Sequence, residues 1–304
     1  MAQQKILVII GPTASGKSDL GVKLAKKLKG EIISADSRQV YKGLDIGTGK
    51  ITKKEMRGIL HHLLDVANPK KQFTVSDYKR LAEEALQYIV KNSKLPIIVG
   101  GTGFYIDVLT GAVLIPEVGP DKKFRKRLNK KTTEELFKLL QKKDVKRAKA
   151  IGPHNKVRLI RALEIIKTLG KIPKNDYRQP PANFIFIGLK PNNLEKRIYQ
   201  RLIKRLTGMI REGKKLHEQG LTYKRMHELG LEYRYVGMYL QGKITKKETV
   251  DKLYVEIKHY AKRQMTWFKR NKKIRWFTLS AVEGFEPKEY KEIERYLIKI
   301  LGGR

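Results

Sequence analysis

The sequence predicts an α/β fold, with a P-loop parallel-sheet core, a helical insertion domain and a helical C-terminal part. Three observations lead to this prediction. Apolar runs alternate with helical patterns over the first 114 residues, and the first of these runs leads directly into a glycine-rich loop. A highly charged helical stretch then separates this part from a later apolar strand.

The N-terminal elements follow from residue periodicity. The pattern predicts strands over 5–10, 32–35 and 97–99, and helices over 17–28 and from Thr74 or Ser76 to Ile89. Strands that alternate with helices form parallel sheets, and such sheets bind ligands outside the carboxyl ends of their strands. We therefore expect the loop after residue 10, Asp36 and Thr102 to converge.

Residues 115–182, in the middle of the chain, are rich in charged residues, and their pattern predicts helices. Thr132 and Glu135 have the spacing of a capping box, and a helix is predicted from about 155 to 168. Pro173, Pro180 and Pro181 mark a linker back to the sheet. We expect 1–114 and 183–304 to form the catalytic core, and 115–182 to form the helical insertion.

The C-terminal part begins with an apolar strand over 184–189. Helices are predicted over 194–218, 223–240 and 246–270, the last opened by a second capping box, Thr245 with Glu248. A strand over 274–279 and a helix over 286–301 complete the predicted elements.

The glycine-rich loop fits the pattern G-x-x-x-x-G-K-[ST]. It comprises Gly11, Pro12, Thr13, Ala14, Ser15, Gly16, Lys17 and Ser18. A strand that delivers such a loop into a helix points successive backbone N–H groups at one place, and the helix dipole and a lysine add positive charge. This nucleotide-binding motif therefore predicts a site for a diphosphate or triphosphate.

The charge balance indicates a polyanionic partner. The chain has 67 Lys and Arg residues against 30 Asp and Glu residues, for a formal net charge of +37. A surface stabilised by ion-pair networks would carry matching acidic residues, and this one does not. Binding nucleic acid would relieve such self-repulsion, so we expect an RNA or DNA partner.

Composition also narrows the class of protein. The chain has no cysteine, which excludes disulfides, thiolate catalysis and cysteine-based zinc sites. No run of 18 apolar residues is present, so no membrane span is expected, and the N-terminus has no secretory leader pattern. These features lead us to expect a cytoplasmic protein.

Asp36 ends a predicted core strand beside the phosphate loop. Its position alone allows a metal ligand, a general base or a cap for the following turn. Phosphate-loop hydrolases end an apolar strand in a Walker-B aspartate, and no predicted strand here ends in Asp followed by Glu. The sequence therefore favours a transferase over a nucleoside triphosphatase motor.

The segment 100–105, Gly-Gly-Thr-Gly-Phe-Tyr, follows another predicted strand. Bare backbone there allows close approach by a ligand, and the two rings could line an apolar slot. A tight strand-to-helix turn with core aromatics explains the pattern equally well. His61 and His62 lie in a polar stretch, where we expect a structural or substrate-side role and no metal.

Basic segments interleaved with aromatic residues occur near the C-terminus. They are Tyr223, 233–235, 258–264 and 267–270. Such mixtures suit phosphate contact with base stacking. Tyr260, Gln264 and Trp267 share one helix face, so part of this region is expected to be core, while Lys262 or Arg263 reaches solvent or ligand.

Together these blocks resemble the tRNA dimethylallyltransferase (tRNA isopentenyltransferase) family. The matching blocks are 11–18, 34–41 (Ser-Ala-Asp-Ser-Arg-Gln-Val-Tyr), 45–48 (Asp-Ile-Gly-Thr), 100–105, 161–164 (Arg-Ala-Leu-Glu) and 260–264 (Tyr-Ala-Lys-Arg-Gln) before Trp267-Phe268. They span nearly the whole chain in the family's order.

The resemblance implies a reaction. Such enzymes transfer the dimethylallyl group of dimethylallyl diphosphate to the exocyclic N6 amine of adenosine at tRNA position 37, in tRNAs that read codons beginning with U. They require Mg²⁺, and their phosphate loop holds the diphosphate. By this resemblance Asp36 is the general base, Thr102 contacts the target base, Lys17 assists catalysis and Ser18 reaches the metal.

The resemblance also implies tRNA contacts, with the helical insertion gripping the anticodon stem-loop. The expected contact residues are Asp36, Ser37, Arg38, Gln39, Thr102, Arg125, Arg158, Arg161, Arg234 and Arg263. We expect a monomer.

The sequence alone leaves three other functions open. They are an isopentenyltransferase acting on free adenine nucleotides, an ATP-dependent kinase of small molecules or polynucleotides, and a non-catalytic RNA-binding protein with a vestigial phosphate loop. The first needs no large cationic surface, and an intact Lys17 and Ser18 argue against the last.

Overall fold

A computed structural model describes residues 4–173, 177–181, 183–281 and 284–302. Within these residues a single parallel sheet has the strand order β3-β2-β4-β1-β5-β6. The strands are β1 (Ile6–Ile10), β2 (Gly30–Ala35), β3 (His61–His62), β4 (Leu95–Gly100), β5 (Phe184–Pro191) and β6 (Ile274–Leu279). The predicted α/β fold with a parallel sheet is confirmed.

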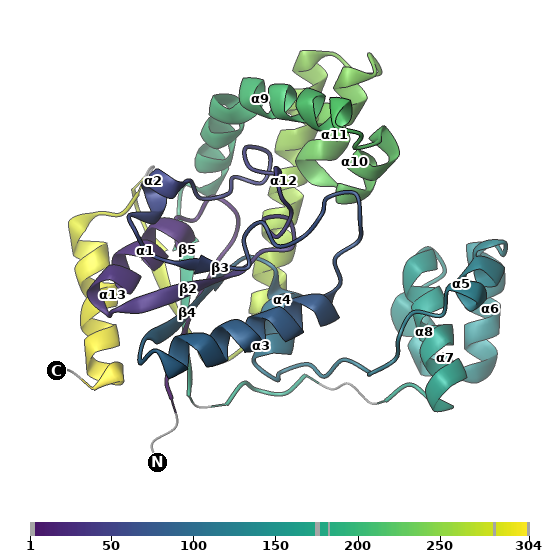
Figure 1. The fold of residues 1–304 in the computed structure, drawn as a ribbon, viewed down its shortest axis with the longest axis horizontal. Coiled ribbons are helices and arrows are strands. Elements are labelled where there is room, and N and C mark those ends of the chain that lie inside the picture. Colours follow the sequence, from purple (N-terminus) through teal and green to yellow (C-terminus); the bar gives the residue numbers. More distant parts are fainter. Residues whose placement is uncertain (1–3, 174–176, 182, 282–283, 303–304) are drawn as a thin grey trace. The chain divides into compact units, whose positions relative to one another are not determined.

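Helices cover both faces of this sheet (Figure 1). One face packs against α1 (Lys17–Lys27) and α13 (Pro287–Leu301), and the other against α3 (Val75–Lys91) and α4 (Gly103–Leu109). Along β1, Leu7 and Ile9 contact the first layer, whereas Val8 and Ile10 contact the second. Burial on both faces explains why β1 is apolar at every position.

Further helices pack beside the ends of the strands. They are α2 (Lys53–Met56), α9 (Leu194–Glu218), α10 (Tyr223–Leu229), α11 (Leu231–Leu240) and α12 (Lys246–Phe268). Ala14 of the phosphate loop is buried in a cluster with residues of α9, α11 and α12. Helices α9, α11 and α12 therefore support the loop.

One predicted helix is wrong. Residues 223–240 form two helices because Gly230 has φ 77° and ψ −171°, which interrupts the helical hydrogen bonds. Glycine adopts this backbone conformation without a steric cost, so α10 ends and α11 begins at this residue.

Residues 113–177 form a compact unit of their own, separate from the unit of residues 1–112 and 178–304. It contains α5 (Lys122–Asn129), α6 (Thr133–Lys143), α7 (Val145–Ile151) and α8 (Lys156–Leu169). Leu136, Leu140, Leu159 and Leu163 are buried in its core. The capping box of Thr132 and Glu135 opens α6 as predicted. The sequence had suggested 115–182 for this segment.

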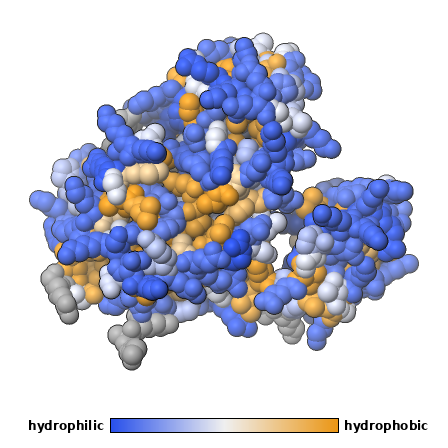
Figure 2. All heavy atoms as spheres, in the orientation of Figure 1, coloured by the Kyte–Doolittle hydropathy of each residue, from blue (hydrophilic) through white to orange (hydrophobic). Residues whose placement is uncertain are grey.

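Hydrophilic side chains cover most of the face drawn in Figure 2, with apolar groups exposed among them. Among the described helices, none combines the length and hydropathy needed to cross a bilayer.

Candidate active site at the ends of the parallel strands

The phosphate loop adopts the strained backbone that its sequence predicts. Gly11 has φ 155°, Ala14 has φ 61° and Gly16 has φ 87°. A Cβ on Gly11 would lie 2.8 Å from the carbonyl oxygen of Leu189 and 2.8 Å from Ser15 Oγ. Only glycine fits there, and the loop leads directly into the N-terminus of α1, where Gly16 is the N-cap residue.

Lys17 folds back over this loop. Its ammonium donates to the Pro12 carbonyl oxygen at 2.7 Å and lies 3.4 Å from Ser15 Oγ. Burial lowers the pKa of Lys17 to about 7, although the Asp36 carboxylate raises it, and the Arg201 guanidinium lowers it further. An anion beside this ammonium would restore its charge.

Asp36 follows β2 directly, at the edge of the sheet. Its Oδ1 accepts the backbone N–H of Arg38 at 2.8 Å and that of Gln39 at 3.3 Å. Asp36 therefore caps the following turn, one of the roles that the sequence allowed, through its Oδ1 atom alone. Within the described part of the chain, Oδ2 accepts no hydrogen bond, which leaves it available to a substrate proton.

Thr102 follows β4 and lies beside the Asp36 turn. Its Oγ1 accepts the N–H of Ser37 at 2.9 Å, and its own N–H donates to Ala35 at 3.1 Å. Burial raises the pKa of the nearby Tyr260 hydroxyl, the Asp36 charge acts in the same direction, and Arg38 and Thr102 act to lower it. The structure thus brings Asp36, Ser37 and Thr102 together.

Two glycines of segment 100–105 lie against neighbouring protein groups, which supports the packed-turn alternative that the sequence left open. A Cβ on Gly100 would lie 2.1 Å from the Ala35 carbonyl oxygen, and one on Gly103 would lie 2.1 Å from the Trp267 ring. Tyr105 is buried and stacks on Tyr78, with ring centroids 4.0 Å apart. Neighbouring protein groups occupy the space that these glycines leave open.

Gln264 of α12 connects the two strand ends, a role that sequence reasoning missed. Its Oε1 accepts the N–H of Thr13 at 2.8 Å, and its Nε2 donates to the Gly101 carbonyl oxygen at 2.9 Å. A buried amide with one donor and one acceptor in use holds the phosphate loop against the β4 turn. The only sequence signal was a glutamine on the apolar face of a helix.

Helix α9 fixes the loop that follows the Asp36 turn. The Glu212 carboxylate accepts the N–H groups of Asp45, Ile46 and Gly47 at 2.7–2.9 Å, and the hydroxyl of Tyr233 at 2.6 Å. The Arg205 guanidinium donates to the carbonyl oxygens of Ile46 and Gly47. These contacts explain the Asp-Ile-Gly-Thr block as a structural loop held by α9.

Arg201 and Glu232 add charges near the site that sequence reasoning also missed. Burial lowers the pKa of Arg201 to about 10, and the neighbouring Arg205 lowers it further. Burial raises the pKa of Glu232, Arg205 opposes that shift, and the Asp36 charge adds to it. Arg201 is therefore a second cation close to Lys17.

The other predicted contact residues of this unit have different surroundings. Arg234 on α11 donates to the His227 carbonyl oxygen of α10 at 3.4 Å. Arg263 is exposed on α12, where it lines a groove of about 500 Å³ with His259, Lys262 and Trp267. Arg38 donates to the Ser37 carbonyl oxygen, and Gln39 to those of Thr48 and Gly49, so both belong to the Asp36 turn.

Within the helical unit, two predicted tRNA contacts have a protein partner. Arg125 and Arg161 donate to the Glu164 carboxylate at 2.6–2.8 Å. Burial acts to raise the pKa of Glu164, but the hydrogen bonds from both arginines bring it to about 2. Arg158 is exposed, and within the described residues its guanidinium forms no ion pair.

The two histidines are structural. His62 Nε2 lies 2.7 Å from the buried Glu31 carboxylate, which also pairs with Lys94 at 2.5 Å. His61 Nδ1 lies 2.9 Å from the Ile59 carbonyl oxygen, and burial lowers its pKa. Among the described residues no group of three His, Asp or Glu side chains could hold a metal ion.

Comparison with known proteins agrees with this geometry. The family model described as IPP transferase matches residues 39–271. A tRNA dimethylallyltransferase of Anoxybacillus flavithermus is 40% identical over 97% of this chain and 96% of its own length. At this coverage the similarity extends over part of the chain that precedes the range matched by the family model.

Solved structures lead to the same family. A full-length tRNA isopentenylpyrophosphate transferase from Bacillus halodurans has a TM-score of 0.74 and 37% identity, covering 98% of this chain and 97% of its own. A eukaryotic dimethylallyltransferase described as acting on tRNA has a TM-score of 0.80 at 23% identity, covering 99% of this chain and 81% of its own, which supports the fold alone.

A phosphate loop, a carboxylate and a hydroxyl at adjoining ends of parallel strands define a P-loop transferase. The chain belongs to the IPP transferase family, because that family's model covers most of it and relatives align over nearly its full length.

Proposed function

We propose that this protein transfers the dimethylallyl group of dimethylallyl diphosphate to the N6 amine of adenosine at tRNA position 37, next to the anticodon, in tRNAs that read codons beginning with U. The product is N6-dimethylallyladenosine. The observation that carries the proposal is the sheet order β2-β4-β1, which puts Asp36 and Thr102 at strand ends adjoining the phosphate loop.

On the donor side, the loop amides, Lys17 and Arg201 receive the diphosphate. Cleavage of the allylic C–O bond leaves negative charge on the departing diphosphate, and fixed cations and amides stabilise that charge. Lys17, whose pKa is about 7 without a ligand, takes up a proton when the anion binds beside it.

On the acceptor side, Asp36 holds the adenine amine. An aromatic amine is a weak nucleophile because its lone pair is delocalised into the ring, so orientation and proton removal both matter. The amine nitrogen attacks the first carbon of the prenyl group, the C–O bond to the diphosphate breaks, and the amine proton passes to Asp36 Oδ2. Thr102, whose Oγ1 accepts the N–H of Ser37 beside Asp36, contacts the same base in this proposal.

The site suits Mg²⁺. Ser18 is exposed at the start of α1, and among the described residues its hydroxyl has no hydrogen-bond partner. Mg²⁺ usually keeps several waters and binds one or two protein oxygens plus substrate phosphates, which this single hydroxyl matches. When bound, the ion would neutralise charge on the leaving diphosphate.

The tRNA accounts for the charge of the chain. A net charge of +37 fits a polyanionic substrate, and a loop nucleotide leaves its stack for a few kcal/mol to enter the site. Ser37, Arg38, Gln39, Arg234 and Arg263 are the candidate contacts of the core, with Arg125, Arg158 and Arg161 those of the helical unit. A monomer acting on tRNA in the cytoplasm completes the proposal.

The decisive experiment offers labelled dimethylallyl diphosphate and Mg²⁺ with unmodified tRNA, with AMP, or with no acceptor. We expect label in tRNA alone, at the adenosine beside the anticodon, shown by nucleoside mass analysis. Label in AMP would favour the free-nucleotide transferase. Phosphate transfer from ATP without prenyl transfer would favour a kinase.

A further inference from the structure

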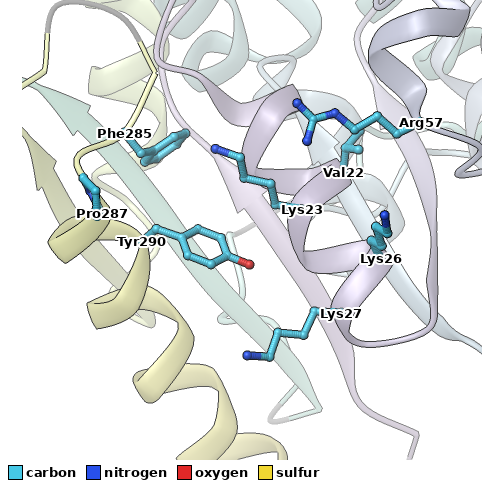
Figure 3. A pocket seen from close by; sticks show the side chains of 8 residues that line it. All are labelled: Val22, Lys23, Lys26, Lys27, Arg57, Phe285, Pro287 and Tyr290. Atoms are coloured by element: carbon cyan, nitrogen blue, oxygen red, sulfur yellow. The ribbon is translucent and has the colours of Figure 1, made fainter.

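A second hollow lies away from the strand ends, between α1 and α13 (Figure 3). Its volume is about 440 Å³, within the range of small-molecule pockets. Its lysines on α1 lie six to ten residues after Lys17, so they begin about 9 Å further along the helix. None of the residues that line it is among the proposed substrate contacts of the active site.

The pocket has an apolar floor and aromatic walls. Val22 forms the floor and is 1% exposed. The rings of Phe285 and Tyr290 pack against the core layer of α1 and remain partly accessible. The Lys23 ammonium lies over both rings, 5.4 Å from the Phe285 centroid and 5.7 Å from the Tyr290 centroid, so a planar group would pack against the accessible ring surface that Lys23 leaves uncovered.

Four cations surround the same hollow. Lys23, Lys26 and Lys27 share one face of α1, and Arg57 extends from the end of α2. Lys23 pairs with Asp19 at 2.9 Å and Lys27 with Glu294, but Lys26 and Arg57 form no ion pair with any described residue. The pocket therefore keeps positive charge that an anion would neutralise.

We propose that this pocket binds a nucleotide unit, with the phosphate held by Lys26 and Arg57 and the base against Phe285 and Tyr290. Guanidinium groups bind phosphate through paired hydrogen bonds, and bases stack on aromatic rings. Free phosphate would not use the rings, and an uncharged aromatic ligand would not use the cations. The unit comes either from a free nucleotide or from an RNA strand.

Phe285 also reaches the phosphate loop. A Cβ on Gly16 would lie 3.2 Å from its ring, and Arg197 links the Ala14 carbonyl oxygen of the loop to those of Ala281 and Gly284. The pocket and the loop are therefore distinct sites that share one wall.

The test measures equilibrium binding of AMP, inorganic phosphate and a short single-stranded oligoadenylate to the full chain. The pocket variant combines Lys26→Glu with Arg57→Glu, and the control combines Lys91→Glu with Lys247→Glu, two exposed lysines outside the pocket. Both double variants change the net charge equally and leave the phosphate loop intact. Tyr290→Leu tests the aromatic wall while keeping apolar packing.

We expect AMP affinity to fall at least tenfold in the pocket variant and several-fold in Tyr290→Leu, with less than a twofold change in the control. Photolabelling with 8-azido-AMP should mark peptides that contain Phe285 or Tyr290. Loss of oligoadenylate binding in the same variant identifies an RNA strand, and binding of AMP alone identifies a free nucleotide.

Three results would overturn the proposal. They are AMP binding that is equal in the pocket and control variants, phosphate binding as tightly as AMP, and no binding of AMP or oligoadenylate. Because prenyl transfer to tRNA is measured separately, failure here leaves the proposed activity untouched.

Discussion

The core site and the helical unit use their charged side chains in different ways. In the core, Glu212 and Arg205 bind backbone groups of the 45–47 loop, while Asp36 and Lys17 contact backbone groups through one Asp36 oxygen and the Lys17 ammonium, and Asp36 Oδ2 accepts no hydrogen bond from the described residues. In the helical unit, Arg125 and Arg161 share the single Glu164 carboxylate, so their two positive charges are partly compensated. Arginine content alone therefore does not locate an RNA contact; the partner of each arginine does.

The strongest test of this contrast is Glu164→Gln in the helical unit. The change leaves two guanidinium groups without their carboxylate and should destabilise this unit by about 3 kcal/mol, the lower end for a broken buried pair, because both arginines are about one-third exposed. Hydrogen exchange of residues 113–177 measures the effect. The exposed pair of Glu134 and Lys138 supplies the control, and Glu134→Gln should cost below about 0.5 kcal/mol.

Acid should weaken the same unit. Because the pKa of Glu164 is about 2 in the folded chain and 4.5 ordinarily, its contribution is complete above pH 4.5 and is lost as pH falls towards 2. A stability of residues 113–177 that does not change over this interval would contradict the role given to Glu164.

On the core side, Lys17→Ala should weaken use of dimethylallyl diphosphate at least about a hundredfold, since two or more charge-assisted hydrogen bonds are lost. Affinity for tRNA should stay nearly constant. Calorimetry in buffers of different ionisation enthalpy should show proton uptake on diphosphate binding at pH 8 in the native chain, because the pKa of Lys17 is about 7 before binding. Binding without proton uptake would argue against this lysine.

Gln264 tests whether the loop needs its support from α12. Gln264→Ala leaves the Thr13 N–H and the Gly101 carbonyl oxygen without a partner, at a cost of about 1–3 kcal/mol, and should raise the KM for the diphosphate about tenfold. Gln264→Glu keeps the acceptor for Thr13 and loses the donor to Gly101, so an intermediate KM is expected. An unchanged KM in both variants would show that the phosphate loop keeps its conformation without the hydrogen bonds from Gln264.

The smallest effect is expected at Arg158. If this exposed arginine contacts an RNA phosphate, Arg158→Ala should weaken tRNA binding about threefold to tenfold. It should also reduce the slope of log affinity against log salt concentration by about one, the value for one lost phosphate contact. Lys138→Ala is the control, since that ammonium pairs with Glu134 at 3.0 Å. Equal effects in the two variants would mean that tRNA affinity depends on the net charge of the chain and not on a contact by Arg158.

Much of the fold follows from local signals in the sequence. The phosphate loop, the capping boxes at Thr132 and Thr245 and the strand over 274–279 all have short-range patterns, and the structure has each of them. The break at Gly230 was missed because an isolated glycine in a helical pattern does not reveal its ψ angle.

The long-range hydrogen bonds that hold the site in place could not be predicted from such local patterns. Gln264 acts on Thr13 and Gly101, at sequence separations of 251 and 163 residues, and no local pattern encodes such a pairing. For the glycines at 100 and 103 the sequence left ligand space and a packed turn equally open, because it shows that room is needed but not which group takes it.

The most direct test of the central claim is a single-turnover assay of Asp36→Asn with labelled dimethylallyl diphosphate and tRNA. The amide Oδ1 can still accept the N–H groups of Arg38 and Gln39, so the turn should persist while the base is lost. We predict prenyl transfer slower by about a hundredfold or more, with tRNA affinity nearly unchanged. Transfer at the native rate would contradict the assignment of Asp36 as the proton acceptor.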